Sequence, residues 1–256
     1  MTVRQMMSRL PVPLLLLAET ASAVELPRLL WRASDLMRQP RGHGEPVIVL
    51  PGFAADDSST LILRTYLQLL GYDVCGWALG INRGDVLDDI PRVADLVRRR
   101  ADESGQRVRM VGWSLGGVIA REVAREDSDI VERVITMGSP VCGGPRLTAA
   151  RYLYALRRQE FDALEAECEQ RNRILLRVPV TAIYASYDGI VAREACFDPH
   201  SKVEHVEVGT THLGLGVSAE VYRIVAQRLA VPTARRRRHA PTIDAETSAP
   251  LLQQTG

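Results

Sequence analysis

The sequence predicts an α/β fold in which a doubly wound, mostly parallel sheet carries helices on both faces. Residues 47–50 form a short apolar run without polar alternation, which is typical of a strand buried on both faces of a parallel sheet. Segments with apolar residues at helical spacing follow such runs, and this alternation implies right-handed crossovers between parallel strands. The 256 residues, of which 46% are hydrophobic, suffice for one well-buried domain.

The same two patterns place the elements along the chain. Strands are predicted at residues 47–50, 72–79, 108–112, 131–137, 180–185 and 203–208, and helices at about 60–70, 86–103, 117–125, 147–168 and 217–229. Residues 56–59 supply N-cap candidates for the first of these helices, and Gly71 ends it. Pro91 lies within the second helix, which leaves a start later than Val86 open. Residues 141–178 interrupt the alternation, and we interpret them as a short helical lid.

The first 40 residues allow two interpretations. Apolar positions recur at helical spacing as far as Met37, and they favour a helical arm over residues 1–40. A secretory signal is the alternative, because two arginines precede an apolar run and Ala21-Ser22-Ala23 is similar to a peptidase site. That run is short and is broken by Pro11 and Pro13. We therefore favour the arm and a cytoplasmic location, with secretion as the alternative.

The composition indicates which domains, cofactors and binding partners to expect. Residues 41–230 form the predicted α/β domain, and residues 231–256, with four consecutive arginines and several prolines, predict a disordered basic tail. A net charge of +1 gives no reason to expect nucleic acid. The four cysteines contain no C-x-x-C pair, so neither a metal site nor a disulfide framework is indicated, and no cofactor is implied. No apolar stretch reaches the roughly 18 residues of a membrane span. Peripheral membrane contact and the oligomeric state stay open.

A G-x-S-x-G pentapeptide, Gly112-Trp113-Ser114-Leu115-Gly116, lies between a predicted strand and a predicted helix. Such a segment is typical of a nucleophile elbow, where a strand turns sharply into a helix and presents a serine hydroxyl. We expect Ser114 to have a positive φ, and side chains at Gly112 or Gly116 to collide with the neighbouring backbone. A glycine-rich turn without chemistry is the simpler alternative.

The serine hydroxyl needs a base, most often histidine, to take its proton. In open α/β sheets active groups gather at the carboxyl ends of the strands, and His212 follows the predicted strand 203–208 in a loop with two glycines. The other histidines lie before a strand, within one or in the tail: His43, His200, His205 and His239. His212 is therefore the predicted base. A metal site built from His200, His205 and His212 fits no ligand spacing.

A carboxylate must hold the imidazole in the right tautomer. Asp188 follows the predicted strand 180–185, again at a carboxyl end, and Gly189 allows a tight turn there. Asp198, near the start of the last strand, is the alternative acid. The predicted order is thus Ser114, Asp188, His212.

The tetrahedral intermediate of acyl transfer needs two donors for its oxyanion, each worth a factor of about 10²–10³ in rate. The backbone N–H of Leu115, directly after the serine, is one candidate. The loop after the first strand supplies the other, because Gly52 lets the backbone approach a substrate and presents Phe53 N–H. The side chain of Phe53 has no part in that role.

With these segments placed, the chain resembles the α/β-hydrolase superfamily, and within it lipase-like and inositol-deacylase-like esterases. The matching segments lie between about residues 46 and 230: Pro51-Gly52-Phe53, the pentapeptide with Gly117, and residues 137–140, 186–191 and 211–215. The resemblance implies Ser114 as nucleophile, His212 as base, Asp188 as orienting acid and a lid at residues 141–178. Two features depart from it. Pro51-Gly52 replaces the His-Gly of many esterases, as in some lipases, and the lid is short.

We therefore expect a serine hydrolase that cleaves a carboxylic, lipophilic ester through an acyl-enzyme, with a small-molecule or lipid ester as substrate. The apolar pattern of the lid is the reason to expect a lipophilic substrate. Two alternatives stay open. An acyltransferase or thioesterase would use the same triad, and a binding protein on a hydrolase fold would have lost catalysis.

Overall fold

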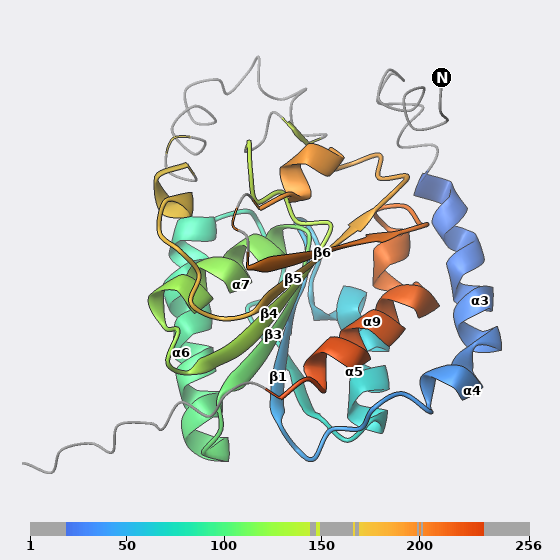
Figure 1. Ribbon diagram of the computed structural model, residues 1–256, viewed down its shortest axis with the longest axis horizontal. Helices are drawn as coiled ribbons and strands as arrows, with labels where there is room; N and C mark the ends of the chain where they lie inside the picture. Colours follow the sequence, from blue (N-terminus) through green and yellow to red (C-terminus); the bar gives the residue numbers. More distant parts are fainter. Residues whose placement is uncertain are drawn as a thin grey trace, which may run out of the picture.

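The computed structural model describes residues 19–143, 147–148, 166, 169–198, 200 and 202–232. A six-stranded sheet lies at its centre, in the order β2-β1-β3-β4-β5-β6, with every neighbouring pair parallel (Figure 1). The strands are β1 (Pro46–Leu50), β2 (Asp73–Gly76), β3 (Val108–Trp113), β4 (Val131–Met137), β5 (Val180–Ala185) and β6 (Val203–Val208). The chain moves outward from β1 in both directions, which gives the predicted doubly wound sheet.

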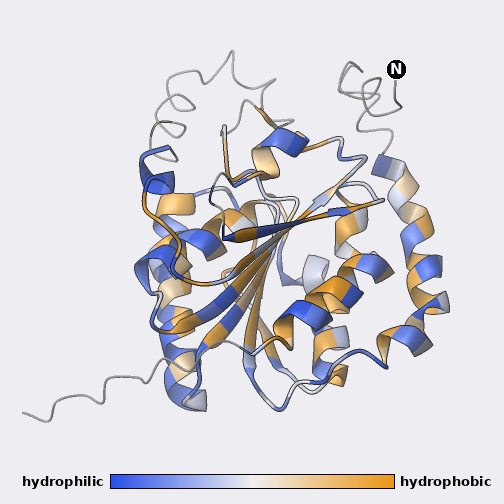
Figure 2. Ribbon diagram, viewed as in Figure 1, coloured by the Kyte–Doolittle hydropathy of each residue, from blue (hydrophilic) through white to orange (hydrophobic). Residues whose placement is uncertain are grey.

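Helices cover both faces of this sheet. In chain order they are η1 (Glu19–Val24), α3 (Glu25–Trp31), α4 (Ala33–Leu36), η2 (Asp57–Thr60), α5 (Leu61–Leu69), α6 (Val86–Ser104), α7 (Leu115–Glu126), η5 (Arg193–Cys196), η6 (Gly214–Gly216) and α9 (Ala219–Leu229). Strand β1 shows why both faces of the sheet are apolar. Val47 and Val49 pack toward α5 and α9, whereas Ile48 and Leu50 pack toward α6 and α7. The strands are largely hydrophobic, and the helices carry mixed hydrophobic and hydrophilic residues (Figure 2).

The helices α3 and α4 run along the outer side of α9, and η1 contacts η6 (Figure 1). Leu29 and Leu36 fix them there, because both side chains are buried in the cluster shared with α5 and α9. The hydroxyl of Tyr66 on α5 donates to the Leu36 carbonyl at 3.3 Å. Within the described part of the chain, no helix combines the length and apolarity needed to cross a membrane.

Three strands, at residues 131–137, 180–185 and 203–208, have the predicted bounds. Strand β2 is shorter than predicted, because the backbone N–H groups of Trp77 and Ala78 donate to the Asp57 carboxylate, each at 3.0 Å. Helix α6 begins at Val86, so the later start is wrong. Pro91 withholds a hydrogen bond from the Leu87 carbonyl, and Leu87 lies near the exposed end of the helix, where water can replace it.

Some predictions lie outside the described residues. The predicted lid helix is one, since only residues 147–148 and 166 of its range are described. Residues 1–18 of the predicted arm and residues 233–256 of the predicted tail are others. Of the four cysteines, Cys75, Cys142 and Cys196 are free thiols in the described residues.

Candidate active site

Ser114 forms the sharp turn between β3 and α7. Its φ is 52° and its ψ is −121°, and its backbone N–H donates to the Met137 carbonyl of β4 at 2.7 Å. A Cβ added to Gly116 would lie 2.6 Å from the carbonyl oxygens of Leu50 and Pro51, and one added to Gly112 would overlap the Gly117 backbone. The expected positive φ and both expected collisions are therefore present. Such a conformation costs about 1–3 kcal/mol, which the packing around it must offset.

Asp188 and His212 form a buried pair at the carboxyl ends of β5 and β6. His212 Nδ1 lies 2.8 Å from Asp188 Oδ2. The other carboxylate oxygen, Oδ1, accepts from the N–H groups of Ile190 at 2.9 Å and Val191 at 2.7 Å. Because a carboxylate only accepts, Nδ1 carries the hydrogen and Nε2 is left free to take a proton.

Ser114 and the His212 ring both contact the backbone at the end of β4, at Met137 and Gly138. A Cβ added to Gly138 would lie 3.0 Å from His212 Cε1 and Nδ1, so the imidazole packs directly on this glycine, which has a φ of 60°. The rings of Trp113 and His212 are 6.3 Å apart between centroids. Among the described hydrogen bonds there is none between Ser114 Oγ and the His212 ring. In free enzymes this bond is often long and shortens when substrate binds.

The loop after β1 passes beside the serine. A Cβ added to Gly52 would lie 3.2 Å from Ser114 Cβ. Neither Phe53 N–H nor Leu115 N–H donates to any described residue, so both remain available to a substrate oxygen. Asn82 holds this loop in place through two hydrogen bonds. Its side-chain Nδ2 donates to the Pro51 carbonyl at 3.1 Å, and its backbone carbonyl accepts from Ala54 N–H at 2.7 Å. No pattern in the sequence marks Asn82, because an asparagine in a glycine-bearing loop is common.

Asp198, the alternative acid, is not the partner of His212. It forms a buried ion pair with Arg121 of α7 at 2.5 Å and accepts from His200 N–H at 2.8 Å. Burial alone would raise the pKa of Asp198, but the Arg121 guanidinium and the His200 N–H hold it below its ordinary value of 3.8. His205 Nε2 accepts from the Asp198 N–H at 3.0 Å. These contacts of Asp198 stabilise the segment that connects β5 to β6.

Glu19 is a second residue that no pattern in the sequence marks. Its side chain is buried, and its carboxylate accepts from the backbone N–H groups of Gly189 at 2.8 Å, His212 at 3.1 Å and Leu213 at 2.8 Å. It therefore joins the turn that carries Asp188 to the turn that carries His212. We call this set of three hydrogen bonds the Glu19 bridge.

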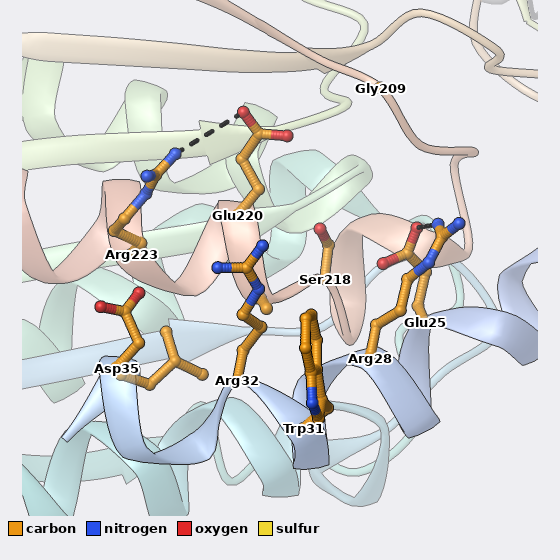
Figure 3. A pocket seen from close by; sticks show the side chains of 11 residues that line it. Glu25, Arg28, Trp31, Arg32, Asp35, Gly209, Ser218, Glu220 and Arg223 are labelled. Carbon is orange, nitrogen blue, oxygen red and sulfur yellow. Dashed lines mark hydrogen bonds and ion pairs between the residues drawn. The ribbon is translucent and has the colours of Figure 1, made fainter.

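A cavity of about 330 Å³ lies between α3, α4 and α9, with Trp31 on one wall (Figure 3). Ser114, Asp188 and His212 do not line it. Two of its arginines pair with glutamates on their own helices, Arg28 with Glu25 and Arg223 with Glu220. The predicted catalytic residues therefore lie outside this cavity.

No known family profile matches the chain. Pimeloyl-[acyl-carrier protein] methyl ester esterase of Vibrio campbellii is 27% identical over 123 residues, which are 46% of this chain and 45% of that protein. The match thus spans less than half of the relative's length.

Solved structures agree over more of the chain. One of the metagenome-derived lipolytic enzymes LipS and LipT gives a TM-score of 0.58 at 14% identity, covering 75% of this chain and 94% of that one. Mature Bacillus licheniformis lipase BlEst2 gives 0.58 at 14% identity, with 76% and 95% covered. A thioesterase domain from the curacin biosynthetic pathway gives 0.53 at 13% identity, with 75% and 93% covered.

The chain has the α/β-hydrolase fold. In an α/β-hydrolase fold the nucleophile, the acid and the base follow in that chain order. Ser114 after β3, Asp188 after β5 and His212 after β6 occupy the corresponding positions at one edge of the sheet.

Proposed function

We propose that this chain is a serine hydrolase that cleaves a carboxylic ester through an acyl-enzyme. The observation that carries the proposal is the buried Asp188–His212 hydrogen bond, whose imidazole packs on Gly138, directly after the Met137 carbonyl that accepts from Ser114 N–H. A serine in a turn without a catalytic role would need neither a positive φ nor a buried imidazole–carboxylate pair beside it.

In the proposed reaction, His212 Nε2 takes the proton of Ser114 Oγ as Oγ bonds to the ester carbonyl carbon. The negative charge on the carbonyl oxygen is stabilised by the N–H groups of Phe53 and Leu115. The tetrahedral intermediate then collapses, the bond to the alcohol oxygen breaks, and the imidazolium returns the proton to that oxygen. Water repeats the sequence on the acyl-enzyme, releasing the acid and restoring Ser114.

A lipophilic acyl group is the second part of the proposal. Phe53, Tyr187 and Leu213 are 65%, 43% and 45% exposed, and each is a proposed site residue or adjoins one in sequence. Exposed apolar side chains that gather around a site favour an apolar ligand. Several similar proteins are named as lipases or esterases, which agrees with this substrate class.

The test is labelling with a fluorophosphonate, together with hydrolysis of p-nitrophenyl butyrate. The wild type should be labelled and should hydrolyse the ester, and Ser114→Ala should do neither while keeping its fold by circular dichroism. Ser139→Ala is the matched control, because Ser139 Oγ is buried and accepts or donates no hydrogen bond within the described residues. Wild-type activity in Ser114→Ala would falsify the nucleophile assignment. An unlabelled, inactive wild type would favour the binding-protein alternative.

A thioesterase or acyltransferase is the second candidate. It is favoured by the thioesterase domain among the similar structures and by the relative whose name includes an acyl-carrier protein ester. Product analysis separates the candidates, because a transferase given an added alcohol or amine should release little free acid. A thioesterase should hydrolyse an acyl thioester faster than the matched oxygen ester.

A further inference from the structure

The Glu19 bridge joins two turns that lie beyond the last paired residues of the sheet. The Asp188 turn follows β5 and the His212 turn follows β6, and the ladder between these strands ends at Ala185 and Val208. Beyond that point the two segments are joined by backbone bonds from Ser186 N–H to the Val208 carbonyl at 2.9 Å and from Tyr187 N–H to the Thr210 carbonyl at 3.1 Å, and by the Asp188–His212 hydrogen bond. A group that fixes the distance between these turns therefore fixes the imidazole relative to its carboxylate.

Glu19 has the contacts to do this. Its Oε1 accepts from both turns at once, from Gly189 N–H at 2.8 Å and from His212 N–H at 3.1 Å, and its Oε2 accepts from Leu213 N–H at 2.8 Å. Gly189 directly follows Asp188, so the carboxylate of Glu19 is bonded to the backbone beside each member of the pair. The side chain is only 2% exposed, and hydrogen bonds to a buried carboxylate are shorter and stronger than those between neutral groups.

We propose that Glu19 is a positioning residue of the active site, which holds the Asp188 turn against the His212 turn and so keeps the imidazole paired with its carboxylate. The inference rests on the proposed hydrolase activity and deepens it. Glu19 itself lies behind the backbone of both turns and bonds to no proposed catalytic side chain.

Glu19→Gln tests this role with the least change in shape. An amide has one acceptor oxygen, so at most the two bonds to Oε1 survive, as weaker bonds to a neutral group, while the NH₂ group opposes Leu213 N–H and displaces the His212 turn. For p-nitrophenyl butyrate, kcat should fall about 10- to 100-fold, since small displacements of reacting groups cost that much. KM should change by less than about 3-fold, because the substrate surface is untouched. The acid limb of the kcat/KM profile should move to lower pH, because a loosened Asp188 stabilises the imidazolium less.

Glu25→Gln is the matched control on the same arm. Glu25 is also buried and loses the same charge, but its Oε1 accepts only from Thr210 Oγ1 at 3.0 Å and from Arg28 at 3.5 Å, and a glutamine can still accept. The kcat of Glu25→Gln and the acid limb of its kcat/KM profile should stay at the wild-type values. This comparison separates a bridge between the two turns from a general effect of the arm on folding.

If Glu19→Gln does not fold, Glu19→Asp replaces it, because it keeps the charge and is too short by one methylene to reach both turns. A folded variant with wild-type kcat and an unmoved acid limb overturns the positioning role. That failure differs from failure of the proposed function, in which the wild type itself would resist the fluorophosphonate or Ser114→Ala would stay active.

Discussion

His212 Nδ1 lies 2.8 Å from Asp188 Oδ2, and the two side chains are each 4% exposed. The second oxygen of Asp188 is occupied by N–H groups of its own turn, from Ile190 and Val191. The carboxylate therefore cannot rotate away without losing those bonds, and the imidazole meets one fixed acceptor. Burial on both sides removes water as a competitor for Nδ1.

Asp188→Asn should lower kcat by about 10³- to 10⁴-fold on p-nitrophenyl butyrate with the fold retained. An asparagine amide that still accepts from Ile190 and Val191 turns its NH₂ toward Nδ1, which favours the wrong imidazole tautomer. Steady-state kinetics measure the effect. Asp198→Asn is the control, and its kcat should stay within about 3-fold of wild type at a temperature where it is folded. A large loss of kcat in Asp198→Asn with a small loss in Asp188→Asn would identify Asp198 as the orienting acid.

Gly116→Ala should lower the free energy of unfolding by at least about 2 kcal/mol, because its Cβ would meet two carbonyl oxygens at 2.6 Å, those of Leu50 at the end of β1 and of Pro51 directly after it. Urea unfolding followed by circular dichroism measures the change. Gly209→Ala is the control, since a Cβ there has no described atom within 4 Å. Equal stability of the two variants would contradict the tight contact between the elbow and β1.

Phe53→Ser separates the two roles given to this position. The backbone N–H remains, so kcat on p-nitrophenyl acetate should stay within about 3-fold of wild type. The exposed ring is lost, so kcat/KM on p-nitrophenyl octanoate should fall about 5- to 10-fold through the loss of apolar contact. Kinetics over acyl chains of increasing length test this, and an equal loss on both esters would exclude the ring as part of an acyl site.

Arg121→Leu should destabilise the protein by about 3–5 kcal/mol, because it leaves the Asp198 carboxylate buried without its partner. The ion pair has side chains that are 2% and 1% exposed. The double variant Arg121→Leu, Asp198→Leu should recover most of that loss, since no buried charge remains. A chemical-denaturation cycle of the four proteins measures the coupling, and strictly additive effects would argue against a pair.

Acid should weaken the ion pair between Arg121 and Asp198. The pKa of Asp198 is lower in the folded chain than its ordinary value of 3.8, so the unfolded chain binds this proton more readily. The stabilisation is therefore complete at pH well above 3.8 and is lost as pH falls through the lower, folded pKa. Wild type and Asp198→Asn, unfolded in urea between pH 7 and pH 3, should converge in stability toward low pH. A constant difference would mean that the pKa of Asp198 is the same in the folded and the unfolded chain, which contradicts the ion pair.

The sheet and the order of the site residues could be predicted because they depend on local patterns. Segments of strand length in which β-branched residues recur give β4, β5 and β6, and parallel strands bring their carboxyl ends to one edge. Ser114, Asp188 and His212 follow those ends, so their common location required no long-range information.

The contacts that hold the site depend on pairs that no local pattern connects. Glu19 bonds to backbone N–H groups 170 to 194 positions away, and any backbone can donate, so no partner residue type marks it. Arg121 and Asp198 are likewise a helix residue and a loop residue, each ordinary in its own context. The early end of β2 has the same origin, since Asp57 captures two N–H groups that the apolar run assigns to the strand.

The Glu19 bridge sets a condition on any maturation of the amino terminus. Position 19 precedes Ala21-Ser22-Ala23, so a leader peptidase that cut there would discard the carboxylate with the leader. The trimmed chain would keep three amide hydrogens aimed at an empty space, behind the two turns on which the proposed chemistry depends. Secretion by that route and an intact bridge therefore exclude each other, and intact-mass measurement of the purified protein distinguishes them.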